Sequence, residues 1–454
     1  MKENNPKIGK DVAATLAIAL VAAVLGYGAV LSLEEPIGAL ALIFLVSMIG
    51  ICWKYPHMGL ALTLGLAPFQ NDVSSGLGPF KLSLGELSLF MCFIVYVIRL
   101  IMKHCEAKRG PYFNAILIYF AICVSSSLAN WSDAALTSLL QMSLYFMMAP
   151  IVFGNFVKKV ELLTIGLYMN VVTCVFLSCY GLATGSFYMF GLHKNGVGSS
   201  LTMGVVIGTE LFLVQKKRMG KGLMLTALCL MTGGLIFTVS RGSWLGALVG
   251  YFVVIGTRGK IKFILQSFLL LVPLIAVFWM LLPDDKKDYA TSFDSKRQNI
   301  SARYETIALA QNKFAESPIF GVGVALRKEM DATNVVWITL AETGVQGLVA
   351  FVMVHLITLI MLFRTQKFVD RSDPRFSMLV LGGALLFAKI MHGAVDHYWS
   401  RGPLLVAWGC CGISTRIYFH EQDRLTKLRI YIMQARRKKM RAIKQKLAQA
   451  QDAA

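Results

Sequence analysis

Residues 223–257 have the sequence LMLTALCLMTGGLIFTVSRGSWLGALVGYFVVIGT, in which two apolar runs flank Ser240-Arg241-Gly242. As one helix, this stretch would be about 52 Å long at about 1.5 Å per residue, whereas the hydrocarbon core of a bilayer is about 30 Å thick. The sequence therefore predicts two membrane-spanning helices, with a turn or helix break at Ser240-Arg241-Gly242 near one membrane surface.

The rest of the chain has the same character. Of its 454 residues 56% are hydrophobic and only 15% are charged, and the mean hydropathy is +0.61. Soluble domains carry about 25% charged residues, so this balance excludes a soluble globular, disordered or disulfide-scaffold protein. We expect an all-α polytopic transmembrane helix bundle of about 12 to 14 spans. The expected spans are 12–32, 37–53, 58–69, 84–102, 112–130, 134–153, 160–183, 197–214, 221–239, 242–257, 263–282, 335–363, 376–391 and 404–420.

The net charge of +20 has a topological explanation. Most of the 45 Lys and Arg residues fall in alternate connections between the apolar runs and in the C-terminal tail. Cytoplasmic loops are enriched in Lys and Arg, so this pattern predicts cytoplasmic N- and C-termini and no nucleic-acid partner.

Three regions follow from this topology. Residues 1–194 are expected to form an N-terminal transmembrane bundle. Residues 195–420 are expected to form a catalytic membrane region that includes an external loop at 283–334. Residues 421–454 form a basic tail suited to the anionic cytoplasmic leaflet of the lipid bilayer.

The external loop contains SARYETIALAQNKFAESP, residues 301–318, which predicts an amphipathic helix with Ser301 as its N-cap and Pro318 beyond its end. Arg303 lies on the apolar face of this helix. A snorkelling arginine is the alternative to a functional one.

Three expected spans begin at the outer surface beside polar residues, where free N–H groups and the helix dipole favour anions. Lys194 and Asn195 precede one of them, Ser240 and Arg241 the second, and Asn334 the third. Arg241 could simply mark the lipid headgroup boundary. Together with a second basic loop, these helix ends favour a site for a phosphorylated ligand.

The last outer segment, MHGAVDHYWSRGP at residues 391–403, carries His392, Asp396, His397 and Arg401. Ionisable groups near the membrane are functional candidates, and a neutral imidazole can act as a base. An interfacial turn with an aromatic anchor remains the alternative. The chain has no cysteine or histidine spacing typical of a metal site.

Several of these pieces together resemble the O-antigen ligase and polymerase superfamily over about residues 195–402. They are SRGSW at 240–244, the helix of Arg303 ending in SPIFGVGVAL, TNVVWITLAETGVQGL from Thr333, and Asn195 in HKNGVGSSL. The resemblance implies a multi-pass glycosyltransferase of the bacterial cytoplasmic membrane, with its active site facing outward. It also implies a polyprenyl-diphosphate-linked glycan donor, a glycan or glycolipid acceptor and no metal or other cofactor. Arg241 and Arg303 match the two arginines that engage the donor diphosphate in that family.

One position departs from the family pattern. Ligases of the family carry a histidine before the asparagine that is Asn334 here, and this chain has Thr333 instead. Since threonine cannot accept a proton near neutral pH, the base would be His392, His397, Asp396 or Glu342. The departure favours a polymerase of lipid-linked repeat units over a ligase to a lipid A core or other acceptor.

The sequence is also compatible with functions of two other classes. One is a polytopic anion or glycolipid transporter, against which stand the lack of an internal repeat and the outer position of the charges. The other is a non-catalytic scaffold that works with other polysaccharide assembly proteins.

Overall fold

The computed structural model describes residues 46–70, 82–157, 159–188, 192–284, 287–288, 293–326, 334–396 and 401–452. Every element in these ranges is helical, which confirms the all-α prediction. His397 and Thr333 lie outside the described residues.

The helices follow the apolar runs of the sequence. Within the part of the chain that the structure describes, seven helical segments are long and apolar enough to cross a membrane: Leu84–Ile101, Asp133–Asn155, Val160–Thr184, Lys194–Val214, Arg218–Phe237, Val335–Gln366 and Pro374–Val395. In order along the chain, the larger helices are α3 (Pro56–Leu66), α4 (Leu84–Ile101), α5 (Phe113–Ser127), α6 (Asp133–Ser143), α7 (Ala149–Asn155), α8 (Thr164–Thr184), α9 (Lys194–Val214), α10 (Arg218–Phe237), α11 (Arg241–Arg258), α12 (Ile261–Leu281), α14 (Phe293–Glu316), α16 (Val335–Gln366), α17 (Pro374–Val395) and α18 (Gly402–Asp452).

The predicted break between the two apolar runs is present, but it lies at residues 238–240, because α10 ends at Phe237 and α11 already begins at Arg241. Between them, Val239 has φ +51°, a left-handed conformation that is unfavourable for a β-branched residue. The chain therefore reverses between the two helices through a strained residue directly beside the predicted site.

The helix of the external segment differs from the sequence prediction at its start. Helix α14 already begins at Phe293, so Ser301 is an interior residue and the prediction of an N-cap was wrong. The Ser301 hydroxyl donates instead to the Glu305 carboxylate at 3.0 Å. The polar residues before Ser301, which suggest a turn by composition, extend the helix by two turns. Its end before Pro318 is as predicted.

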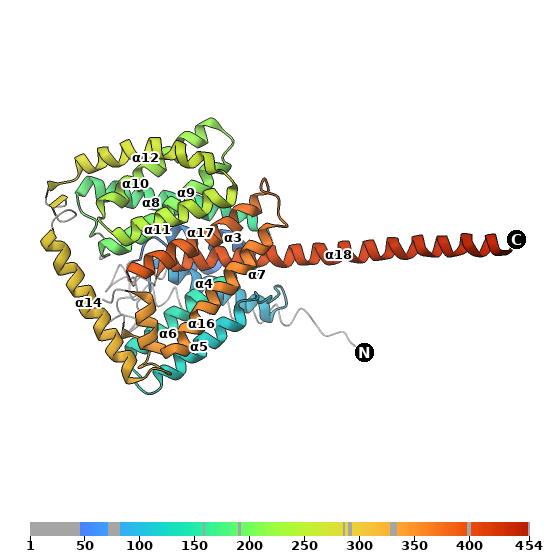
Figure 1. Cartoon of the computed structure of the whole chain (residues 1–454), viewed down its shortest axis with the longest axis horizontal. Helices are drawn as coiled ribbons and strands as arrows, with labels where there is room; N and C mark the ends of the chain where they lie inside the picture. The colour runs from blue at the N-terminus through green and yellow to red at the C-terminus, as the bar shows by residue number, and fades with distance from the viewer. Residues whose placement is uncertain are drawn as a thin grey trace.

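Helix α14 lies obliquely across one end of the bundle, at the left of Figure 1. We call this end the α14 end, and the opposite end, from which α18 projects, the tail end. Helix α18 continues without a break from Gly402 to Asp452, past the boundary predicted at residue 420.

Helices α9, α11 and α17 form the centre of the second half of the chain. Glycines on α11 allow this close packing: a Cβ on Gly246 would lie 2.8 Å from the Ala388 carbonyl oxygen, and one on Gly250 would lie 2.4 Å from Val206. Small residues are typical of such close helix contacts in membrane proteins.

At the tail end the same three helices are joined by buried polar groups. The Arg258 guanidinium of α11 pairs with the Glu210 carboxylate of α9 and donates to the Ser377 hydroxyl of α17 at 2.7 Å. It also lies over the Phe376 ring, 4.9 Å from the ring centroid. The relative positions of α9, α11 and α17 are thereby fixed at the end remote from the predicted site.

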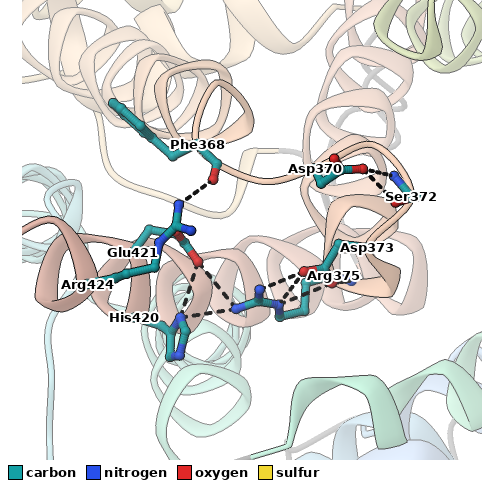
Figure 2. A network of polar contacts seen from close by, with 8 residues as sticks. All are labelled: Phe368, Asp370, Ser372, Asp373, Arg375, His420, Glu421 and Arg424. Atoms are coloured by element: carbon teal, nitrogen blue, oxygen red, sulfur yellow. Dashed lines mark hydrogen bonds and ion pairs between the residues drawn. The ribbon is translucent and has the colours of Figure 1, made fainter. Parts of the chain in front are cut away.

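A second polar network joins the start of α17 to α18 where that helix leaves the bundle (Figure 2). The Arg375 guanidinium reaches the Asp373 carboxylate at 2.6 Å and Glu421 at 3.3 Å. Glu421 is almost fully buried and also pairs with Arg424, which donates to the Phe368 carbonyl at 2.9 Å. The network holds α18, at the point where it leaves the bundle, against the connection between α16 and α17.

Candidate functional site

The last turn of α17, residues 392–396, lies at the α14 end and contacts residues of four other helical elements. We call this turn the α17 end. Each contact comes from the beginning of a helix or from α14, and the contacting residues are far apart in the sequence.

Asn195, in the first turn of α9, provides the first contact. Its side-chain amide donates to the Asp396 carboxylate, with 2.7 Å between Nδ2 and Oδ2. The Asn195 backbone N–H is capped by the His193 ring at 3.3 Å, which fixes the start of α9. Asp396 is the C-cap residue of α17, and its backbone N–H donates to the His392 carbonyl at 2.9 Å.

The beginning of α11 provides the second contact. A Cβ on Gly242 would lie 2.9 Å from the His392 ring and 3.0 Å from the Val395 side chain, so only glycine fits here without displacement. The Ser243 hydroxyl lies 3.5 Å from His392 Nε2 and 2.8 Å from the hydroxyl of Ser240. His392 and Ser240 are both buried.

Arg303 and Asn334 provide the remaining contacts. A helix leaves its last carbonyl groups without intrahelical partners. The Arg303 guanidinium of α14 donates to the Val395 carbonyl at 3.0 Å, and the Asn334 amide donates to the Ala394 carbonyl at 2.9 Å. The Asn334 side-chain oxygen also caps α16 by accepting from the Val336 N–H at 2.7 Å.

Arg241 is the residue before Gly242, and its side chain is exposed. Among the residues that the structure describes, no hydrogen-bond or ion-pair partner of its guanidinium is present. Gly242, the residue after Arg241, packs on the Val395 side chain, and Arg303 binds the Val395 carbonyl, so the backbone at Arg241 lies near the residue that Arg303 contacts. With the N-termini of α9, α11 and α16 beside them, these two side chains make the surface around the α17 end suited to an anion.

The remaining predicted site residues are less directly connected. The Arg401 guanidinium donates to the Gln70 carbonyl, and the Gln70 amide donates to the Gly196 carbonyl at 3.0 Å and the Ser200 hydroxyl at 2.7 Å. Arg401 therefore supports the first turns of α9 through Gln70. Lys194 is the first residue of α9.

Glu342 has a different surrounding from the other candidate bases. Its carboxylate accepts from the Ala325 N–H and its backbone carbonyl from the Gly323 N–H, both at 3.0 Å. Gly321, at φ +73°, packs so closely against the Glu342 carbonyl that a Cβ would lie 2.3 Å away. Glu342 therefore holds the segment after α14 against an interruption of α16 at Gly344.

Lys389 was missed by sequence reasoning. It is fully buried in α17, two turns below Asp396, and its ammonium donates to the Ser199 hydroxyl of α9 at 3.2 Å. The signal was available, because Lys389 is the one charged residue in the apolar run from Phe376 to Met391, and such residues in membrane helices are functional candidates.

An apolar pocket of about 620 Å³ lies between α9, α10, α11 and α12. Its lining includes Leu235, Trp244, Tyr251, Phe263 and Trp279. Trp244 is one turn beyond Arg241 and donates its indole N–H to the Leu235 carbonyl at 2.7 Å. The pocket therefore begins close to the exposed arginine and extends along apolar side chains.

Comparison with known proteins agrees with this arrangement. Residues 226–352 match the family model described as O-Antigen ligase. The matched stretch includes Arg241, Arg303 and Asn334, whereas Asn195, Lys389, His392 and Asp396 lie outside it. No curated protein matches the chain significantly. The family match confirms the predicted resemblance, and the apolar helices confirm that the chain is a membrane protein.

Proposed function

We propose that this chain, a membrane glycosyltransferase of the O-antigen ligase and polymerase type by its residues 226–352, polymerises lipid-linked oligosaccharide repeat units into a surface polysaccharide. The donor is a glycan on a polyprenyl diphosphate, and the acceptor is a sugar hydroxyl of another lipid-linked repeat unit. The α14 end faces outward from the bacterial cytoplasmic membrane, in accord with the distribution of basic residues.

The observation that carries this proposal is the meeting of Asn195, Gly242, Arg303 and Asn334 at the α17 end. It unites cations, helix N-termini and a carboxylate at one surface, as transfer from a diphosphate requires. A transporter would need its charged groups along a path through the membrane, and the arginines of this site lie at the end of the bundle instead.

The reaction breaks the bond between the anomeric carbon and the diphosphate oxygen, and the electron pair stays with the diphosphate. Arg241 and Arg303 stabilise the charge that develops there, and each good donor contributes on the order of 3 kcal/mol in such sites. Arg303 is held by the Val395 carbonyl through one nitrogen, which leaves its other N–H groups for the substrate.

The acceptor hydroxyl forms the new bond to the anomeric carbon and loses its proton. Asp396 is the proposed acceptor of that proton, because its carboxylate is only half-buried and is oriented by Asn195. His392 is buried beneath Gly242, so its role is to position the α17 end through Ser243. His397 remains a candidate from the sequence alone.

The apolar pocket beside Arg241 suits the polyprenyl chain of the donor. Its lining of leucine, tryptophan, tyrosine and phenylalanine side chains offers mainly hydrocarbon contact. A lipid seated there has its diphosphate at the beginning of α11.

Purified protein incubated with lipid-linked repeat units tests the function. A ladder of products that differ by one repeat unit is expected from a polymerase. Transfer of a single glycan to a lipid A core, without a ladder, would indicate a ligase, and movement of intact lipid-linked units across vesicles without new bonds would indicate a transporter.

A further inference from the structure

We propose that Lys389 is a positioning residue whose buried ammonium group keeps Asp396 in the carboxylate form at the acceptor site. This inference rests on the proposed function, and it assigns a role to a residue outside the matched family domain.

Two side-chain hydrogen bonds connect α9 to α17. Asn195 and Ser199 are four residues apart and share one face of α9. Asn195 binds Asp396 at 2.7 Å, and Ser199 binds Lys389 at 3.2 Å. Lys389 lies in α17 about two turns before its end, and Asp396 is the C-cap residue of the same helix.

The charges of Lys389 and Asp396 explain why these two hydrogen bonds depend on each other. An isolated buried ammonium is costly, and in a membrane helix it requires an opposite charge or hydrogen-bonding partners. The Ser199 hydroxyl supplies a hydrogen bond, and Asp396, at the C-terminal end of the same helix, supplies an opposite charge. In return, the positive charge disfavours the neutral acid form of Asp396, which could not accept a proton.

The other charged or titratable groups around Asp396 come from every element packed against the α17 end. They are Arg241 of α11, Arg303 of α14, His392 of α17, and Lys194 and the N-cap residue His193 at the start of α9; Asn195 and Asn334 contribute neutral amides. Lys389 is the cation placed beneath the carboxylate, on the side away from a diphosphate bound by the arginines. A diphosphate that occupies the arginines therefore leaves the effect of Lys389 on Asp396 in place.

The test compares rates of product formation by purified full-length protein between pH 5 and 9 for wild type, Lys389→Met and Lys389→Arg. For Lys389→Met, we expect the acid limb of kcat to move to higher pH by on the order of one unit, with the rate largely restored at the highest pH. Lys389→Arg keeps the charge and should keep the wild-type limb. Thr358→Val, a change at a buried α16 hydroxyl bonded only within its own helix, is the matched control and should not move the limb.

The inference would be overturned if Lys389→Met lowered the rate equally at every pH or left the acid limb of kcat unmoved. The limb would stay unmoved if Lys389 were neutral in the wild-type protein. If Lys389→Met does not yield folded protein, adding Asp396→Asn should recover it, because the half-buried Asp396 carboxylate then no longer stands without the Lys389 charge. Failure of this double variant to recover would likewise contradict the role. Absence of turnover by wild-type protein would instead contradict the proposed function.

Discussion

The side chains of Asn195 and Asp396 form a 2.7 Å hydrogen bond that joins the beginning of α9 to the end of α17 across 201 positions of sequence. Hydrogen bonds to charged groups contribute about 1.5–3 kcal/mol. The bond thus fixes both the direction of the carboxylate and the separation of two helices that carry the site.

Asn195→Ala should lower the polymerisation rate by about tenfold, because Asp396 loses its orienting donor. Asn195→Asp should lower it further, since a second carboxylate would repel both Asp396 and a diphosphate. Initial rates with lipid-linked repeat units measure both effects, and Asn312→Ala on the exposed face of α14 is the control. Equal rates for the Ala and Asp variants would argue against an anionic ligand beside Asn195.

Arg241→Lys and Arg303→Lys should each reduce the rate by at least tenfold although the charge is kept. Lysine lacks the planar fork that binds phosphate oxygens in pairs, and at position 303 it would also lose the geometry that reaches the Val395 carbonyl. Product length in cells and initial rates in vitro provide the measurement. Arg364→Lys, exposed at the tail end of α16, should be silent. Full-length polymer from Arg241→Lys would remove the diphosphate role of Arg241.

Gly242→Ala and Gly256→Ala place the same methyl group on the same helix in opposite surroundings. A Cβ at Gly242 would lie 2.9 Å from His392 and 3.0 Å from Val395, whereas nothing lies within 4 Å of one at Gly256. We expect Gly242→Ala to lower activity several-fold by displacing the α17 end. Gly256→Ala should keep activity and stabilise α11 by about 0.5–1 kcal/mol. Rates and thermal melts of the two variants would disprove this if they were the same.

These contacts also define what the sequence could predict. The break between α10 and α11 followed from length alone, because a helix from Leu223 to Thr257 would be too long for a bilayer. Arg241, Arg303, Asn334, His392 and Asp396 were identified as separate polar groups near helix ends. A common diphosphate site for Arg241 and Arg303 was expected, but its position around one turn of α17 could not be predicted, since it depends on glycine-mediated packing of α11 on α17.

Two local features show the same limit. Residues 293–300 are helical although their composition is typical of a turn, so the N-cap predicted at Ser301 was wrong. The role of Lys389 depends on Ser199, which lies 190 positions away and has no distinctive sequence context.

The stability of the tail end should depend on pH through Asp373. Its hydrogen bonds with the Arg375 side chain, assisted by the charge of Arg375, lower the pKa of Asp373 below its ordinary value. A carboxylate with a lowered pKa in the folded state stabilises the protein above the unfolded-state pKa of about 3.9, and this contribution is lost as pH falls through the folded-state value. Asp373→Asn keeps an N-cap but loses the ion pair.

Thermal melts should therefore show wild type more stable than Asp373→Asn by about 0.5–1 kcal/mol from pH 8 to pH 5, because the pair is partly exposed. The difference should shrink below about pH 4. A difference that persists at pH 3, or grows there, would show that the ion pair is not its source.

The buried pair of Glu210 and Arg258 should matter far more for stability than an exposed pair. Glu210→Gln leaves the Arg258 guanidinium buried without its counter-charge, which costs about 3–5 kcal/mol in the free energy of unfolding. Glu316→Gln, which breaks the exposed pair with Lys313, should cost about 0.5 kcal/mol. Thermal melts in one detergent compare them directly. Since α9, α11 and α17 also carry Asn195, Arg241 and Asp396, Glu210→Gln should lower activity below its melting temperature although it lies at the opposite end. Unchanged activity of Glu210→Gln below its melting temperature would mean that the α17 end is fixed by its own contacts alone.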